Sequence, residues 1–309
     1  MGDIGKCTEV ALGSLELSPF NECDYRFYPT PKPYSPCDGS LARNPTIEEI
    51  YPNLSLRWTE HEDADKSKSG TQLLFLVRHG ETMMNASGRL QGRGVDVSLN
   101  EVGEGQAEAL GIFLRNVPFG AVISSSLKRA HETATMVMKQ NKATIAASSC
   151  PNLLADSMIA QVGGDVEVEG KVSVMQDPGV DELSWGELEG EDQNEQPWSG
   201  LLEDLKEGWF NGDLDRSAKR GESPNEVMSR ATASVAKVVS KGHRMNLIVS
   251  HGRTLRVLML ALCGRNLSEM RHMGVIPNTG LYVVEANASV TPPTYRLIST
   301  AWGREGRDQ

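Results

Sequence analysis

Two short apolar runs, each followed by a His-Gly pair, constrain the fold of this chain more than any other feature. The first run is LLFLV at residues 73–77, with His79 two positions beyond it, and the second is NLIV at 246–249, followed by His251. Their length and β-branched content are typical of strands buried on both faces of a sheet. Because ligands of parallel sheets bind outside the carboxyl ends of the strands, we expect both histidines at one edge of one sheet.

Helical periodicity alternates with these strands along the chain. The clearest helix start is at residue 224, where Ser223, Pro224 and Glu226 form a capping box with proline at the first helical position. Ser98 and Asn100 are both candidate caps for an earlier helix. Strands alternating with helices predict an α/β fold, a three-layer sandwich with a mainly parallel central sheet and helices on both faces. The expected helices are 101–115, 127–140, 224–241 and 254–263, and the further strands are 120–123, 281–285 and 295–298.

The organisation of the chain is predicted from shifts in composition. Residues 1–70 contain a proline cluster and a charged stretch, which predict an N-terminal extension that is partly irregular. Residues 71–303 form the predicted catalytic domain, and 304–309 form a polar tail. Within the domain, a glycine-rich acidic stretch predicts an inserted loop near 155–178 that could act as a substrate-selecting lid.

Composition excludes several classes of function. The net charge of −10 argues against a general nucleic-acid or membrane-surface binder, which needs a basic face. The five cysteines form no CxxC pair and have no metal-like spacing with histidine, so we expect free thiols in a reducing, cytoplasmic compartment and no metal site. No apolar run reaches the roughly 18 residues that a membrane helix needs. No cofactor is implied.

The residues after the first strand suit phosphoryl chemistry. A phosphoryl group presents three oxygens, and the guanidinium of Arg78 can donate two parallel hydrogen bonds to them. His79 beside it could attack phosphorus in line and form a phosphohistidine, provided that its other nitrogen is held by an acceptor. His251 could donate to the phosphoryl oxygens as charge develops. From these residues alone, a surface Arg-His pair and an incidental histidine at a helix start remain the alternatives.

Five motifs in order resemble the histidine phosphatase superfamily, in its phosphoglycerate mutase-like branch. The resemblance covers about residues 73–300 and implies a phosphoglycerate mutase-like fold. One departure is Leu127, which follows a serine where a proline often intervenes. The motifs are LVRHGET with Asn85 and GRLQG (76–92), SLNEVGEGQA (98–107), SSLKRAHETA (125–134), GES (221–223) and VSHG (249–252).

The resemblance implies roles for particular residues. His79 is the phosphorylated nucleophile, and Glu182, in the segment VDELSWGELEG (180–190), is the general acid. A carboxyl group that is partly desolvated near phosphate is expected to have a raised pKa, which suits proton donation. Asp181 and Glu187 are rival acids, and a solvated acidic loop is the alternative reading. The implied substrate-binding residues are Arg78, Asn85, Gly92, Arg129, His251 and Gly252, of which Arg78, Arg129 and His251 are also counted as catalytic.

The predicted function is a phosphatase that hydrolyses phosphate monoesters of small metabolites through a phosphohistidine. The alternatives are a phosphoglycerate mutase and a protein-binding member of the fold that contacts partners through its extension. Family mutases resemble one another in a basic lid after the acid segment, whereas this chain has the acidic stretch 189–195, which is expected to repel a bis-anionic substrate. Arg253 and Arg256 are expected to face solvent, with contact to the substrate as the alternative. Glu222 and Ser223 are expected to serve the helix start, with a contact to the site as the alternative. A homodimer is left open.

Overall fold

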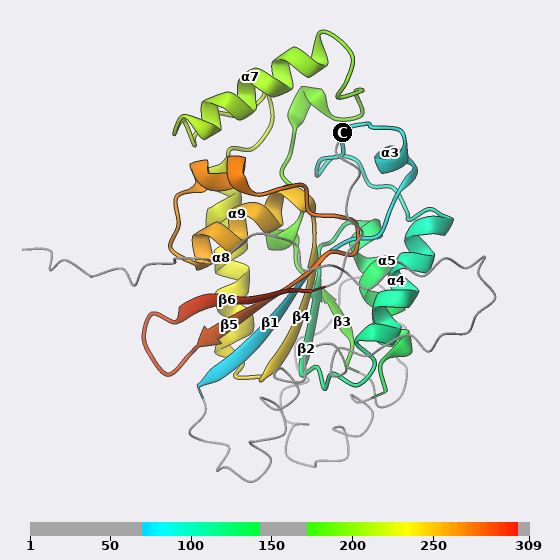
Figure 1. Cartoon of the computed structure of the whole chain (residues 1–309), viewed down its shortest axis with the longest axis vertical. Coiled ribbons are helices and arrows are strands. Elements are labelled where there is room, and N and C mark those ends of the chain that lie inside the picture. The colour runs from blue at the N-terminus through cyan, green and yellow to red at the C-terminus, as the bar shows by residue number, and fades with distance from the viewer. Residues whose placement is uncertain (1–69, 143–171, 302–309) are drawn as a thin grey trace, which may run out of the picture.

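The computed structural model describes residues 70–142 and 172–301, and its centre is one six-stranded sheet (Figure 1). The strand order across the sheet is β3-β2-β4-β1-β5-β6. The predicted N-terminal extension, most of the inserted loop and the polar tail lie outside the described residues. The strands are β1 (Thr71–Arg78), β2 (Ala121–Ser124), β3 (Val174–Gln176), β4 (Met245–Ser250), β5 (Leu281–Asn287) and β6 (Thr294–Ala301).

The sheet is mixed but mainly parallel, as predicted. β3, β2, β4 and β1 pair in parallel, whereas β5 runs antiparallel to both β1 and β6. In the β1–β4 ladder, Arg78 lies opposite Ser250, so the two strands end at the same level. The His-Gly pairs that follow therefore leave the sheet together.

Helices cover both faces of the sheet and complete three layers (Figure 1). One apolar core joins the sheet to α4 and α5, and a second joins its other face to α8 and α9. The α/β three-layer prediction is confirmed. The helices are α3 (Met83–Ala86), α4 (Glu101–Phe113), α5 (Lys128–Gln140), α7 (Trp198–Phe210), α8 (Pro224–Ser240) and α9 (Gly252–Leu262), with short 3-10 turns η2 (Pro178–Val180), η3 (Gly186–Leu188) and η4 (Leu267–His272).

Local capping fixes the starts of two helices as the sequence indicated. Of the two candidate caps for α4, Asn100 is the one used, and its side chain accepts from the backbone N–H of Gly103. Ser223 and Glu226 form the capping box of α8, with Pro224 in its first turn. No helix among the described residues is long and apolar enough to cross a bilayer.

Two of the elements that were not predicted, β3 and α7, bear on the arrangement of the site. The C-terminal end of the predicted inserted loop, 174–176, is strand β3 and pairs with β2, so this part is integral to the sheet. Helix α7 lies at the end of the molecule where α3 lies, beyond the sheet (Figure 1). Its apolar face packs with the segment after Glu182 in a third core, through Trp209, Trp185 and Leu183 among others.

Candidate active site

The two histidines meet at the carboxyl ends of β1 and β4. Their ring centroids are 5.1 Å apart, with the rings tilted by 55°. His79 is 3% exposed and His251 is fully buried, so neither belongs to a solvated surface pair. Residues 172 positions apart in the chain thus form the two imidazole walls of one site.

His79 is held as a neutral imidazole with one nitrogen available. Its Nδ1 lies 2.6 Å from the carbonyl oxygen of Gly80, and because a carbonyl only accepts, Nδ1 carries the proton. The Nε2 lone pair is then unprotonated. Burial lowers the pKa of His79 well below its usual value, and the charges of Arg129 and Arg78 lower it further. This is the protonation state that a nucleophile requires.

Two guanidinium groups flank His79. Arg129, in the first turn of α5, is fully buried and donates from Nη1 to Val95 O at 2.6 Å and from Nη2 to Gly92 O at 3.2 Å. Arg78 donates from Nη1 to Ile276 O at 2.6 Å. Within residues 70–142 and 172–301, Nε of each arginine has no hydrogen-bond partner. Both side chains are therefore positioned by backbone carbonyls and keep donors for an anion.

A hydrogen-bond relay orients His251. The hydroxyl of Ser125 donates to Asp181 Oδ1 at 2.7 Å, which leaves its lone pairs to accept from His251 Nε2 at 2.8 Å. The proton of neutral His251 is therefore on Nε2, and its buried Nδ1 has no partner among the described residues. Burial lowers the pKa of His251 well below its usual value, and Arg129, His79 and Arg78 add to the effect. To donate to an anion through Nδ1, His251 must gain a proton.

Glu182 lies at the N-terminus of α9, beside the arginines. Its Oε1 accepts from the backbone N–H of Leu183 at 2.9 Å and of Thr254 at 3.0 Å, and from the Thr254 hydroxyl at 3.1 Å. Its Oε2 accepts from the Arg253 N–H at 3.2 Å. The carboxyl group is 7% exposed, so the alternative of a solvated acidic loop does not apply at this position.

Asp181 and Glu187, the rival candidates for the general acid, lie in environments that differ from that of Glu182. Asp181 is 2% exposed and its carboxylate accepts from Ser125, from both the N–H and the hydroxyl of Ser126, and from Arg93. Those contacts tie Asp181 to the loop after β2. Glu187 is exposed on η3. Of the three carboxylates, only Glu182 is both buried and held beside the α9 N-terminus.

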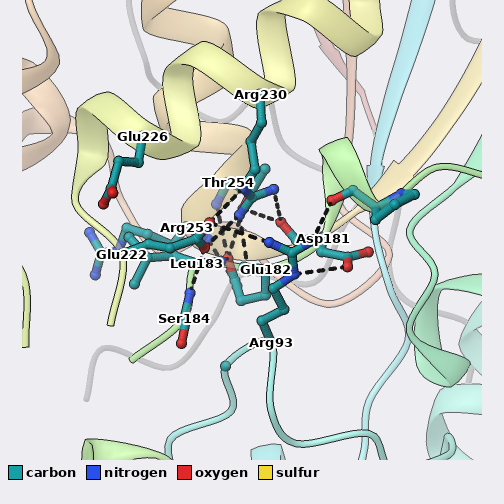
Figure 2. Close-up of polar contacts among 12 residues, drawn as sticks. Arg93, Asp181, Glu182, Leu183, Ser184, Glu222, Glu226, Arg230, Arg253 and Thr254 are labelled. Carbon is teal, nitrogen blue, oxygen red and sulfur yellow. Dashed lines mark hydrogen bonds and ion pairs between the residues drawn. The ribbon is translucent and has the colours of Figure 1, made fainter. Parts of the chain in front are cut away.

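An unpredicted ion pair holds the acid segment in place (Figure 2). Arg230 of α8 donates to the carbonyl oxygens of Gly179, Asp181 and Glu182 at 2.8 to 3.1 Å, and pairs with Glu222 through two bonds of 3.0 Å. Glu222 also accepts from Ser184 N at 2.9 Å. The expectation that Glu222 serves the start of α8 was wrong, because Ser223 and Glu226 do so.

The remaining predicted binding residues, Asn85, Gly92 and Gly252, contact or closely approach residues of the site. Asn278 donates to both the His79 carbonyl, at 3.1 Å, and Asn85 Oδ1, at 3.3 Å, so Asn85 is tied to the nucleophile's backbone. Gly92 contributes its carbonyl to Arg129. A Cβ at Gly252 would lie 3.4 Å from Arg78 Nε, which shows how closely the start of α9 approaches that guanidinium.

Arg253 and Arg256 do not face solvent, and that expectation was wrong. Both are half-buried, and the Arg253 guanidinium lies 5.5 Å from the Trp185 ring centroid and 5.7 Å from that of Trp209. One sequence signal could have indicated their position: Arg253 and Arg256 are three residues apart, which places both on the same face of α9, close to His251. Within the described ranges, no group of three or more His, Cys, Asp or Glu could hold a metal ion.

Comparison with known proteins identifies the family. The model of the histidine phosphatase superfamily (branch 1) matches residues 74–152 and 165–291, more than half of the chain. The chain belongs to this superfamily. The match includes all of the residues that form the site, and the resemblance inferred from the five motifs is confirmed.

Individual relatives differ in the activities that their names carry. The Danio rerio "Probable fructose-2,6-bisphosphatase TIGAR A" is 29% identical over 219 residues, covering 67% of this chain and 85% of that protein. The Erwinia tasmaniensis "Probable phosphoglycerate mutase GpmB" is 32% identical, covering 62% and 74%. A mycobacterial glucosyl-3-phosphoglycerate phosphatase structure superimposes with a TM-score of 0.55 at 22% identity, covering 75% of this chain and all of the other, and supports the fold.

Proposed function

We propose that this histidine phosphatase hydrolyses phosphate monoesters of small metabolites through a phosphohistidine at His79. The observation that carries the proposal is the fixed tautomer of His79, which leaves Nε2 unprotonated, with the guanidinium groups of Arg78 and Arg129 near enough for their charges to lower the pKa of the imidazole. Names of relatives that include a fructose-2,6-bisphosphatase and a glucosyl-3-phosphoglycerate phosphatase support a hydrolase that acts on phosphate esters.

In the first step, His79 Nε2 attacks phosphorus in line and the bond from phosphorus to the ester oxygen breaks. Arg78, Arg129 and protonated His251 stabilise the charge on the phosphoryl oxygens. The leaving alkoxide takes a proton from Glu182, which therefore enters the step as a carboxylic acid. His251 takes up its second proton from solvent when the substrate binds, because a bound dianion favours the protonated imidazole.

In the second step, water attacks the phosphohistidine. Glu182, now ionised, accepts the proton of that water while the bond from phosphorus to Nε2 breaks, and inorganic phosphate leaves. His79 returns to its neutral tautomer because Gly80 O still holds the Nδ1 proton. No metal ion takes part in the proposed mechanism. The scattered cysteines favour a reducing, cytoplasmic location, which belongs to the same proposal.

Hydrolysis is preferred to the mutase reaction because of the segment after the acid. Between Glu182 and Lys206 the chain has no Arg or Lys, so it offers no pair of basic residues there to retain a phosphorylated intermediate. A mutase must hold such an intermediate while it reorients on the enzyme. The other alternative, a protein-binding member of the fold that contacts partners through residues 1–70, would leave the catalytic residues without a role.

The test is hydrolysis of p-nitrophenyl phosphate at mildly acidic pH with excess chelator. We expect activity in chelator and its loss, by at least about a thousandfold, in His79→Asn, which keeps a polar side chain in a buried position. The matched control is His272→Ala, a substitution of an exposed histidine at the end of η4, which should leave the rate unchanged.

Other outcomes separate the alternatives. A rate that chelator abolishes would overturn the metal-independent mechanism, and full activity in His79→Asn would overturn the nucleophile. Interconversion of phosphoglycerates that depends on 2,3-bisphosphoglycerate and exceeds phosphate release would favour the mutase.

A further inference from the structure

Three consecutive peptide groups carry the main chain away from the nucleophile, and the first of them joins His79 to Gly80. Its carbonyl oxygen accepts from Asn278 Nδ2 at 3.1 Å and from Thr279 N at 3.2 Å. Its N–H donates to Thr133 Oγ1 at 3.0 Å. This peptide is therefore held at both ends, by the segment before β5 and by α5.

The third peptide, which joins Glu81 to Thr82, is also held at both ends. The Glu81 carbonyl oxygen accepts from Asn100 N at 3.0 Å. The Thr82 N–H donates to Asn85 Oδ1 at 3.2 Å, as part of the capping box of α3. Neither the first nor the third peptide can rotate without breaking hydrogen bonds to other segments.

The second peptide, between Gly80 and Glu81, sets the tautomer of His79. Its carbonyl oxygen accepts from His79 Nδ1 at 2.6 Å. Its N–H points the opposite way, as in any trans peptide, and donates to Gln106 Oε1 at 2.9 Å. Gln106 is a half-buried residue of α4. One side chain from another element thus holds the peptide plane whose carbonyl fixes the proton of His79 on Nδ1.

Rotation of this second peptide would inactivate the nucleophile. If the plane turned over, the Glu81 N–H would face His79 Nδ1, which can accept that bond only when it carries no proton. The imidazole proton would then lie on Nε2, whose lone pair would no longer be available to attack phosphorus. No net proton is gained or lost, because the two neutral tautomers differ only in the position of one proton.

Close packing of α4 on this peptide brings Gln106 into position. A Cβ at Gly80 would lie 2.5 Å from Gly103 O, and a Cβ at Gly103 would lie 2.1 Å from Glu81 O. Two glycines therefore let the first turn of α4 reach the nucleophile's main chain, and Gln106 follows Gly103 by one helical turn. Because Gly80 has no side chain to restrict its own backbone, the restriction has to come from a partner of the peptide.

We propose that Gln106 is a positioning residue for the nucleophile. By accepting from the Glu81 N–H, it keeps the Gly80 carbonyl turned toward His79 and so keeps Nε2 unprotonated. The inference rests on the proposed phosphatase function, in which His79 Nε2 attacks phosphorus. It also gives a role to the last part of the motif at 98–107, of which only Asn100, the cap of α4, has a structural role above.

Substitutions of similar size separate the acceptor of Gln106 from the shape of its side chain. Gln106→Met and Gln106→Leu remove the acceptor, whereas Gln106→Glu keeps an oxygen acceptor at the same place. The matched control is Gln140→Met. Gln140 is a half-buried glutamine on α5 whose side chain donates to Glu108 of α4 at 3.1 Å, outside the site.

The direct measurement is the tautomer of His79, read from ¹⁵N–¹H correlation spectra of protein with labelled imidazoles. The chain has six histidines, and the signal that disappears in His79→Asn is that of the nucleophile. We expect the proton on Nδ1 in the wild-type protein, in Gln106→Glu and in Gln140→Met. Gln106→Met and Gln106→Leu should show a population with the proton on Nε2. A signal that remains wholly Nδ1–H in both would overturn the proposal.

The kinetic measurement separates the state of the nucleophile from binding of phosphate. We expect Gln106→Met to lower kcat for p-nitrophenyl phosphate by about tenfold, as the loss of one buried hydrogen bond would give. Binding of inorganic phosphate, measured by calorimetry, should weaken by less than about twofold, because Arg78, Arg129 and His251 are unchanged. Gln106→Glu should keep kcat within about threefold of the wild-type value.

General damage to the fold would give a different pattern. Parallel losses of kcat and of phosphate affinity in Gln106→Met, or equal losses in Gln106→Met and Gln106→Glu, would overturn the positioning role. Thermal unfolding identifies a temperature at which all variants are folded, and both measurements are made there. Gln106→Leu repeats the test if Gln106→Met does not fold.

Failure of this proposal is distinguishable from failure of the phosphatase proposal. If the wild-type protein does not hydrolyse p-nitrophenyl phosphate, the phosphatase proposal fails, and the spectra still test whether Gln106 sets the tautomer. If hydrolysis is observed and the tautomer does not depend on Gln106, only the positioning role is overturned.

Discussion

Ser125→Ala tests whether the relay from Asp181 through Ser125 sets the charge state of His251. The Ser125 hydroxyl donates to Asp181 and accepts the Nε2 proton of His251 at 2.8 Å. In the free enzyme, alanine leaves His251 able to move its proton to Nδ1. With a phosphoryl group bound, however, His251 is protonated on both nitrogens, and the buried Nε2–H then has no acceptor.

The cost of that substitution follows from burial. An unsatisfied donor at a fully buried site costs about 1 to 3 kcal/mol, and His251 is fully buried. Because the cost falls on the bound state and not on the free enzyme, we expect kcat/KM for p-nitrophenyl phosphate to fall by about 5- to 150-fold. The effect should be largest above neutral pH, where uptake of the proton by His251 is least favourable.

Ser126→Ala is the matched control for this prediction. Ser126 also donates its hydroxyl to Asp181, at 2.9 Å, but has no contact with His251. We expect less than about a twofold loss in kcat/KM, and in a His251→Gln background Ser125→Ala should cause no further loss. Equal effects of the two serine substitutions, or a full effect of Ser125→Ala without His251, would refute the relay.

Two further predictions concern the charges around the site. Binding of inorganic phosphate near neutral pH should take up about one proton, because the pKa of His251 is low in the free enzyme and rises beside a dianion. Calorimetry in buffers of different ionisation enthalpy measures this uptake. The same uptake in His251→Gln would contradict the prediction. Arg230→Met should lower the free energy of unfolding, measured in urea, by about 3 kcal/mol, because it removes the cation that pairs with Glu222 and the donor to three carbonyl oxygens. A loss below about 1 kcal/mol would show that the ion pair does not hold the acid segment.

Elements with strong local signals were predictable from the sequence. The runs that became β1 and β4 are continuous and apolar because both faces of the central strands are covered. The start of α8 is specified by a capping box that operates within four residues. The reversed strand β5 and the sheet position of β3 were not predictable, because strand direction and neighbours depend on packing between segments distant in the chain.

The same distinction holds for the active site, where residues placed by strand ends were predictable and contacts between distant segments were not. Arg78 is the last residue of β1, and His79 and His251 directly follow β1 and β4, so their convergence could be inferred from topology alone. The contacts of Ser125 with His251 and of Arg230 with the acid segment join residues 126 and about 50 positions apart, and no local pattern encodes them. The packing of α7 against the acid segment was missed because the helix itself was not predicted.

The most direct test of the whole account is to trap the phosphorylated enzyme. The protein is mixed with a ³²P-labelled phosphate ester, quenched within milliseconds and digested for peptide mapping by mass spectrometry. The account predicts a label that is labile in acid, stable in base and located on the peptide that contains His79, with none in His79→Asn. A label on another residue, or turnover by the wild-type protein with no trapped phosphoenzyme in either acid- or base-quenched samples, would contradict it.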